Sequence, residues 1–253
     1  MTADLSIEEN TNVSVLEAKN LRKFFKSREV VKGASFHVKK GEVVGLLGPN
    51  GAGKTTSFYM IVGLLFPTEG EVLLDGENIT DLPMHHRAKR GISYLPQNMS
   101  IFRRMTVEDN LRSIMEIAKT PTHERKDFLD FLLTKFQITH IAKSMGAALS
   151  GGERRRVEIA RSLIIKPKFL LLDEPFAGID PVTVQEIQKI IEKLRDEDGL
   201  GVLITDHNVR ETLGSCDRAY ILTGGQIIAH GSATQIAEDP KVRSVYLGEN
   251  FRL

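Results

Sequence analysis

Apolar residues in the first part of the chain form short runs that predict strands, with one helical pattern among them. Residues 43–47 are continuously apolar and lead into a Gly-Pro-Asn-Gly sequence, as expected of a buried strand that ends at a loop. Residues 54–65 predict a helix, and an Asp-Gly pair within residues 71–80 predicts a β-hairpin. Residues 13–95 are therefore expected to combine antiparallel hairpins with one parallel strand–loop–helix unit.

The second part of the chain has a different pattern. Residues 107–163 carry apolar positions at a spacing of three and four and show no convincing strand, which predicts a helical block. Two strand–helix steps follow, with strands at 169–173 and 202–205 and a helix that starts at Pro181 after Asp180 as N-cap. The pattern predicts an α/β fold with an inserted helical lobe, in which residues 13–248 form one domain between tails at 1–12 and 249–253.

Composition excludes several classes of protein. The 253 residues are 41% hydrophobic and 26% charged, which argues against disorder. The 34 basic and 33 acidic residues leave a net charge of +1, so no overall basic field favours nucleic acid as a partner. Cys216 is the single cysteine, which excludes an internal disulfide. Apolar runs stay well short of the about 20 residues that cross a bilayer, so we expect the chain not to span a membrane.

The strongest chemical signal follows the strand at 43–47. Its sequence fits the pattern G-x-x-x-x-G-K-[ST] and consists of Gly48, Pro49, Asn50, Gly51, Ala52, Gly53, Lys54, Thr55 and Thr56. Glycines allow the backbone N–H groups to surround a phosphate, and the N-terminus of the next helix adds positive potential. This pattern predicts that Lys54 contacts the β- and γ-phosphates of a nucleotide and that Thr55 binds Mg²⁺.

Two carboxylates follow the apolar strand at 169–173, of which Asp173 is the last residue and Glu174 the next. Ligands of open α/β sheets bind beyond the carboxyl ends of the strands, so we expect Asp173 at the metal and Glu174 at the attacking water. Alone, Asp-Glu-Pro after a strand is more typical of a turn. His207 follows the strand at 202–205 and is expected at the same edge, near the γ-phosphate.

A second candidate anion site begins at Ser150. Ser150 and Glu153 stand in the relation of a capping box, which predicts a helix N-terminus. Gly151 and Gly152 disfavour the first helical turn, so we infer that their bare N–H groups bind a phosphate supplied by a second copy of the chain. The next three residues, Arg154 to Arg156, are interpreted as a solvated helix face balanced by Glu153 and Glu158.

These motifs, in this order, resemble the ATP-binding cassette (ABC) family over residues 13–248. The resemblance implies an ABC-type P-loop NTPase with a RecA-like core, an antiparallel β lobe and a helical lobe, which hydrolyses ATP with Mg²⁺ as a homodimer. It makes Glu174 the catalytic glutamate, Gln97 an ATP and metal contact, and Asp180 the end of the D-loop. By the same resemblance, His207 is the switch histidine and Ser150, Gly151 and Gly152 belong to the signature motif that faces the partner's ATP.

Two positions depart from the common pattern of this family. The aromatic residue that stacks on adenine is often Tyr in this family, and its counterpart here is Phe25, with Phe24 as the neighbouring alternative. The signature ends in Glu153, where many members have Gln, and Glu153 keeps the capping role.

Three stretches, at 94–104, 199–213 and 245–253, are similar to the ATPase subunits of bacterial lipopolysaccharide export systems. This similarity implies a peripheral position on the cytoplasmic face of the inner membrane, bound to two integral-membrane permease subunits near Gln97 to Arg104. Lipopolysaccharide itself would not touch this chain. Ile101 and Phe102 would be either exposed anchors for a permease helix or part of the packing of the helical lobe.

Three other functions are weighed against export. The ATPase subunit of a branched-chain amino-acid importer has the same size and motifs. A cassette ATPase that acts on DNA or ribosomes usually has two cassettes or a long coiled-coil insertion, and neither is present here. Glu174 and His207 argue against a nucleotide-binding regulator that does not hydrolyse ATP.

Overall fold

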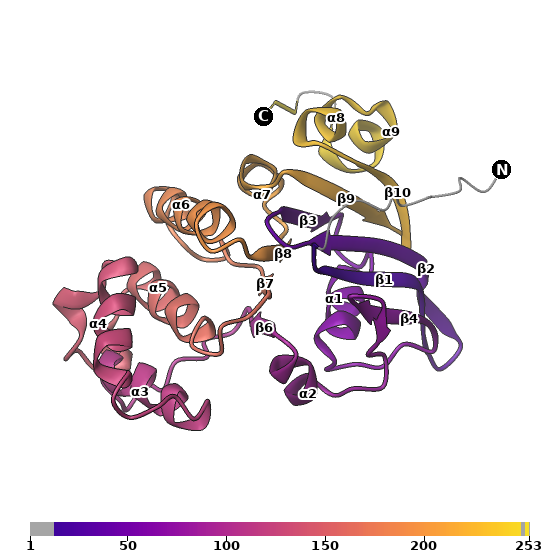
Figure 1. The fold of residues 1–253 in the computed structure, drawn as a ribbon. Coiled ribbons are helices and arrows are strands. Elements are labelled where there is room, and N and C mark those ends of the chain that lie inside the picture. The colour runs from indigo at the N-terminus through magenta and orange to yellow at the C-terminus, as the bar shows by residue number, and fades with distance from the viewer. Residues whose placement is uncertain (1–12, 249–250, 253) are drawn as a thin grey trace.

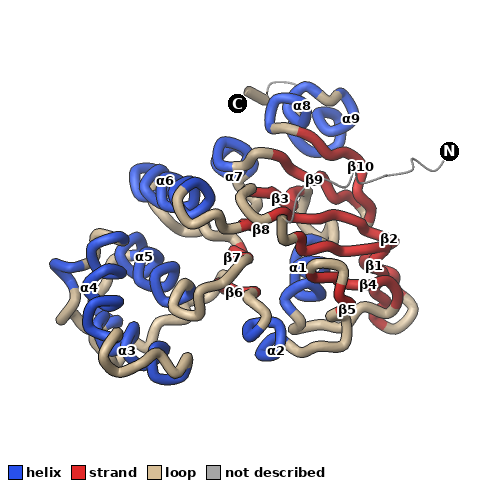
Figure 2. The backbone as a smooth tube through the Cα atoms, in the orientation of Figure 1, coloured by secondary structure: helices blue, strands red, loops and turns tan. Residues whose placement is uncertain are grey.

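Two β-sheets and a separate group of helices make up the structure (Figures 1 and 2). The computed structural model describes residues 13–248 and 251–252. The predicted N-terminal tail, residues 1–12, lies outside the described residues, as do residues 249, 250 and 253 of the predicted C-terminal tail. Among the described residues, no helix is long and apolar enough to cross a membrane.

The first sheet is antiparallel and has the strand order β2-β1-β4-β5. Its strands are β1 (Val15–Phe25), β2 (Arg28–Lys39), β4 (Glu69–Leu74) and β5 (Glu77–Asn78). Asp75 and Gly76 connect β4 to β5 with φ angles of 52° and 80°, as a two-residue hairpin turn requires. The hairpin that the Asp-Gly pair predicted is confirmed.

The second sheet has the order β10-β9-β3-β8-β7-β6, and all its pairs are parallel except β9 with β10. Its strands are β3 (Val43–Leu47), β6 (Ile92–Leu95), β7 (Phe169–Asp173), β8 (Gly201–Thr205), β9 (Arg218–Thr223) and β10 (Gln226–Gly231). Every residue of β3, β7 and β8 is buried, which explains why these strands are continuously apolar instead of alternating. The strands β3, β8 and β7 are neighbours and parallel, so their carboxyl ends meet at one edge of the sheet.

Helices of the core lie against this sheet. They are α1 (Lys54–Val62), α2 (Met84–Lys89), α6 (Pro181–Asp196), α7 (Val209–Ser215), α8 (Ala233–Glu238), α9 (Pro240–Val242) and the π-helical turn Arg243–Leu247. The helix α1 is three residues shorter than predicted, because Gly63 ends it in a left-handed conformation with φ 84°. Asp180 caps α6 as predicted and accepts a hydrogen bond from the Thr183 N–H at 3.0 Å.

The predicted helical block contains α3 (Val107–Ile117), α4 (Arg125–Lys135), α5 (Gly151–Ser162) and two 3₁₀ turns, Thr139–Ile141 and Gly146–Ala148. Figure 1 shows α3, α4 and α5 gathered on one side of the second sheet, with α6 between them and α7. We call α3–α5 with their connections the helical lobe. Its buried apolar residues form one continuous cluster with those of α6 and β7, so the lobe is packed onto the core.

Candidate active site

The phosphate loop, residues 48–56, connects the buried end of β3 to the first turn of α1. Gly48 has φ 151°, and a Cβ atom there would lie 1.9 Å from the carbonyl oxygen of Leu222 on β9. Gly53 has φ 101° and approaches the carbonyl oxygen of Val30 on β2. Both positions therefore require glycine, because a side chain would force the loop away from the two neighbouring strands.

Lys54 is buried inside this loop. Its Nζ donates hydrogen bonds to the carbonyl oxygens of Gly48 at 2.6 Å and Pro49 at 3.0 Å. Burial lowers the pKa of Lys54, and the negative charges of Glu174 and Asp206 act in the opposite direction. The loop thus holds a cation whose nearest partners are neutral carbonyls, which suits an anionic ligand better than solvent.

An open pocket of about 340 Å³ lies over the loop. Its walls come from both sheets and consist of Phe25, Arg28, Val30, residues Asn50 to Thr56 of the loop, and Glu174. Phe25 lines this pocket and is 48% exposed, whereas its neighbour Phe24 is not part of the lining. The geometry therefore favours Phe25 over Phe24 as the aromatic residue beside a bound base.

Asp173 ends β7, is 3% exposed, and does not itself line the pocket over the phosphate loop. Its Oδ1 accepts a hydrogen bond from the Thr205 hydroxyl at 2.8 Å, and burial raises the pKa of Asp173 while this bond lowers it. The hydroxyl-bearing Thr55 is exposed at the pocket. An oxygen-only set of one carboxylate and one hydroxyl matches the preference of Mg²⁺, which usually takes its remaining ligands from phosphate and water. The described residues therefore fit the predicted metal.

Glu174 contacts two other predicted site residues, Gln97 and His207. Its Oε2 accepts a hydrogen bond from Nε2 of Gln97 at 2.6 Å and lies 3.2 Å from Nδ1 of His207. The Glu174 backbone has φ 45°, a conformation that costs a non-glycine residue about 1 kcal/mol. It is held there by a 2.7 Å hydrogen bond from its N–H to the carbonyl oxygen of Thr205. Such strain is typical of residues whose direction serves a site.

Asp206 is a further residue of the site that the sequence analysis did not predict, because only its neighbour His207 matches a motif of the family. Asp206 is fully buried, and it accepts hydrogen bonds from the N–H groups of Phe176 at 3.2 Å and Asn208 at 2.8 Å. Burial raises the pKa of Asp206, and the two backbone bonds lower it. Asp206 thereby connects the segment after Glu174 to the segment that carries His207.

The signature segment does not line the pocket over the phosphate loop. Ser150 and Glu153 form the predicted capping box at the start of α5. A Cβ at Gly152 would lie 2.3 Å from Cγ2 of Thr183 on α6, so packing within the chain already requires this glycine. Nothing lies within 4 Å of a Cβ built at Gly151, which instead borders a small pocket beside Gln97 and Glu174. Asp180 is exposed. Four further predicted ATP contacts are also absent from the lining of the pocket over the phosphate loop: Gly48, Pro49, Gln97 and Asp180.

The interpretation of Arg154 to Arg156 as a solvated face is wrong for the middle residue. Arg155 is 5% exposed and Glu158 is 3% exposed, and the two side chains approach to 3.4 Å. Arg155 also donates to the carbonyl oxygens of Pro96 and Asp173. This could not be predicted, because a buried arginine in a charged run cannot be told from an exposed one by residue type alone.

Glu158 holds the segment after Gln97 in place. Its Oε1 accepts hydrogen bonds from the N–H groups of Ser100 at 2.6 Å and Ile101 at 3.2 Å. Ile101 is 6% exposed and belongs to the core cluster, so the second of the two predicted alternatives, packing within the helical lobe, holds for Ile101. Phe102 is 43% exposed, with the guanidinium of Arg161 5.0 Å from its ring centre. Of the two apolar side chains, only Phe102 is exposed.

Comparison with known proteins agrees with this geometry. The family model "ABC transporter" matches residues 31–177, and the model "Branched-chain amino acid ATP-binding cassette transporter" matches residues 226–252. The lipopolysaccharide export system ATP-binding protein LptB of Haemophilus influenzae is 59% identical over 95% of this chain and 100% of its own length. Its namesake in Escherichia coli K12 is 57% identical with the same coverage.

Solved structures have the same fold. The ADP conformation of an ATP-binding cassette of an ABC transporter aligns with a TM-score of 0.83 at 30% identity, over 94% of this chain and all of that one. A dimeric post-hydrolysis cassette bound to ADP and Pi aligns with a TM-score of 0.75 at 27% identity, over 86% of this chain and 98% of that one. These matches confirm the predicted ABC-type P-loop NTPase fold. The chain belongs to the ABC transporter family, as an ATPase cassette.

Proposed function

We propose that this chain hydrolyses ATP to power the export of lipopolysaccharide from the inner membrane, as a homodimer bound to two integral-membrane permease subunits on the cytoplasmic face. The observation that carries the ATPase chemistry is the contact of Glu174 with both Gln97 and His207 beside the phosphate loop. The choice of cargo is supported by the 57–59% identity to relatives named for lipopolysaccharide export.

In this proposal the phosphate loop binds the triphosphate. Lys54 exchanges its bonds to two carbonyl groups for bonds to the β- and γ-phosphates, and the loop N–H groups and the N-terminus of α1 supply further donors. Thr55, Asp173 and Gln97 would hold Mg²⁺, which neutralises phosphate charge when it is bound. Phe25 would stack on the adenine.

Glu174 is the proposed general base. Both of its observed side-chain contacts are made by Oε2, so Oε1 is the oxygen that can accept a hydrogen bond from the attacking water. Gln97 and His207 orient the carboxylate, and the fixed backbone of Glu174 keeps it directed to the pocket over the phosphate loop. These contacts fix the direction of the carboxylate, so little reorganisation is needed during the reaction.

Ser150, Gly151 and Gly152 are proposed to complete the site of the partner chain. They do not line this chain's own pocket over the phosphate loop, although they form a helix N-terminus suited to an anion. The dimeric arrangement of a related cassette with ADP and Pi supports this assignment. Asp180, at the start of α6, belongs to the same proposed interface.

A branched-chain amino-acid importer remains the second candidate, because the model named for such transporters matches residues 226–252. That match covers only the C-terminal part of the chain. The relatives named for lipopolysaccharide export match over 95% of the chain, which includes most of the same segment. We therefore favour export.

Phe102 is the proposed permease contact. Replacement of Phe102 by Glu places a charge on an exposed ring position and should weaken capture of the permease subunits by about tenfold or more, as loss of an aromatic anchor typically does. Binding of ATP to the purified chain should not change. The comparison is made by pull-down of the tagged chain from solubilised membranes, with Phe66→Glu, at another exposed phenylalanine, as control. Equal capture by wild type and Phe102→Glu would contradict the docking proposal.

The complete proposal is tested by capture with the Glu174→Gln variant from detergent-solubilised membranes in ATP and Mg²⁺, followed by mass spectrometry. We expect two multi-span subunits of the lipopolysaccharide export type. Recovery of amino-acid permease subunits would overturn the cargo and keep the ATPase assignment. Recovery of ribosomal or DNA-repair proteins without any membrane subunit would overturn the transport function.

A further inference from the structure

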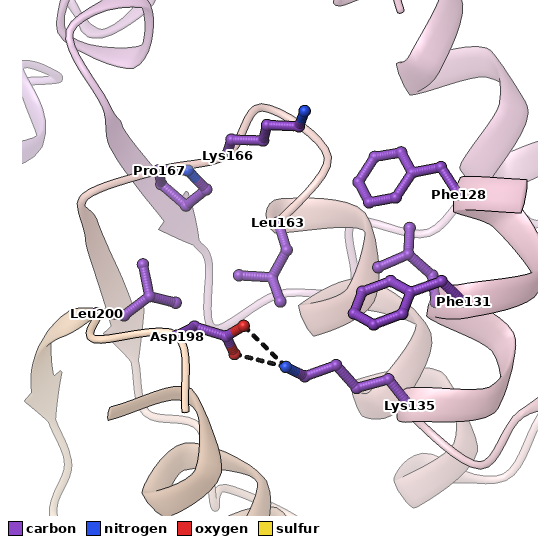
Figure 3. Close-up of a pocket in the computed structure, with 9 residues that line it drawn as sticks. Phe128, Phe131, Lys135, Leu163, Lys166, Pro167, Asp198 and Leu200 are labelled. Carbon is purple, nitrogen blue, oxygen red and sulfur yellow. Dashed lines mark hydrogen bonds and ion pairs between the residues drawn. The ribbon is translucent and has the colours of Figure 1, made fainter. Parts of the chain in front are cut away.

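An ion pair crosses the seam between the helical lobe and the core at the end of α4 (Figure 3). Nζ of Lys135, the last residue of α4, donates to both carboxylate oxygens of Asp198, at 2.8 Å and 2.6 Å. Glu197 lies 3.8 Å from the same Nζ. Asp198 and Glu197 belong to the turn between α6 and β8, so Lys135 ties the helical lobe to the core sheet.

The seam beside this pair is not closely packed. Phe128, Phe131 and Leu163 face Pro167 and Leu200 across a cavity of about 210 Å³. The rings of Phe128 and Phe131 are nearly parallel, at an interplanar angle of 17°, and Phe131 is 52% exposed. Apolar side chains that border a cavity lose contacts and restrain their neighbours less than close-packed ones do. The ion pair therefore adds a constraint at the part of the seam where apolar packing is looser.

The other end of the lobe is fixed near the start of α6. There Gly152 is in close contact with Thr183, and Arg156 pairs with Glu186 at 2.9 Å. The 16 residues of α6 span about 24 Å, so these contacts and the Lys135 ion pair lie at opposite ends of the apolar face through which the lobe packs on α6. Two contacts at opposite ends of this apolar face limit rotation of the lobe on the core more than the first contact alone would.

From this geometry we propose that Lys135 and Asp198 are positioning residues that set the orientation of the helical lobe, and with it the direction in which Ser150 to Gly152 face the partner chain. The inference rests on the proposed role of this segment in the partner's ATP site. Lys135 is partly buried, with 15% of its side chain exposed, against 35% for Asp198. A pair of this kind is screened less than two fully exposed charges.

The test uses Lys135→Glu, Asp198→Lys and the double exchange in the full chain, with Lys126→Glu as a control of equal charge change on an exposed position of α4. Spin labels at Asp130 on α4 and Lys241 on α9 report the distance between lobe and core, in a Cys216→Ala background that hydrolyses ATP normally. Steady-state ATP hydrolysis and nucleotide binding are measured on the same proteins without labels.

Each single variant is expected to broaden the distance distribution and to lower kcat by about fivefold, the upper range for one partly exposed ion pair, with unchanged nucleotide affinity. The double exchange should restore most of the narrow distance distribution and most of the wild-type kcat. Repulsion between Glu197 and the glutamate of Lys135→Glu limits this recovery. Unchanged distances in the single variants would overturn the inference and leave the proposed function standing. Altered distances with normal hydrolysis would overturn both the positioning role and the role of the signature segment. A third result would also overturn the inference: the single variants lose hydrolysis and have a lower Tm, and the double exchange restores neither. The ion pair would then contribute to stability alone.

Discussion

The Glu174→Gln variant is expected to hydrolyse ATP about 10³-fold more slowly than the wild-type chain, while it binds ATP normally. The amide cannot accept the proton of the attacking water, and loss of a general base typically costs about 10²–10⁴-fold in rate. The substitution preserves shape, and the carbonyl oxygen of the new side chain can still accept the hydrogen bond from Gln97 that Oε2 accepts in the wild type. The measurements are single-turnover hydrolysis and equilibrium binding of ATP.

If the signature segment closes on the partner's ATP, this variant should also accumulate as a dimer in ATP and Mg²⁺, because hydrolysis no longer separates the two chains. Sedimentation in ATP compared with ADP measures this directly. Glu238→Gln makes the same chemical change at an exposed position of α8 and should behave as wild type. Turnover of Glu174→Gln at the wild-type rate would exclude Glu174 as the base.

The parts of the fold that the sequence predicted well are those with strong local signals. The boundaries of β3, β7 and the start of α6 follow from continuous apolar runs and from Asp180 and Pro181, and the structure has them at the predicted positions. The strand β6 has only four residues, and its partner β7 lies more than 70 positions later in the chain. The pairing of β6 with β7 therefore depends on a tertiary contact, which a local sequence pattern does not predict.

The candidate site shows the same division. The phosphate loop and Glu174 were recognisable because a phosphate demands glycines, a lysine and a hydroxyl at fixed spacing. Arg155 and Glu158 were misread, because whether a charge on a helix is exposed depends on which face meets the core. Phe24 and Phe25 are adjacent and chemically equal. Successive side chains of β1 point to opposite faces of the sheet, and only the structure shows which of the two lines the pocket. Sequence motifs thus identify candidate ligand contacts better than the residues that hold those candidates in position.

Lys54→Ala is the second large effect, and it should appear in affinity instead of rate. The variant removes the cation of the phosphate loop, whose charge-assisted hydrogen bonds to phosphate are worth about 1.5–3 kcal/mol, so ATP affinity should fall by about 10- to 100-fold. Folding stability should change little, because the desolvation that lowers the pKa of Lys54 in the native state is removed together with its two bonds to carbonyl groups. Titration with a fluorescent ATP analogue measures the affinity, and thermal unfolding measures the stability.

Lys40→Ala removes the same charge at an exposed turn before β3 and should leave affinity unchanged, which separates a local effect from one of net charge. Affinity of Lys54→Ala equal to wild type would refute the role of Lys54 in phosphate binding.

The comparison with Glu174→Gln is more informative than either variant alone. The two side chains line one pocket, and the charge of Glu174 raises the pKa of Lys54, yet one is expected to change binding and the other the chemical step. If both variants changed affinity by the same factor and left the rate of bound ATP intact, Glu174 would be an electrostatic partner of Lys54 and the base would have to be sought elsewhere in the site.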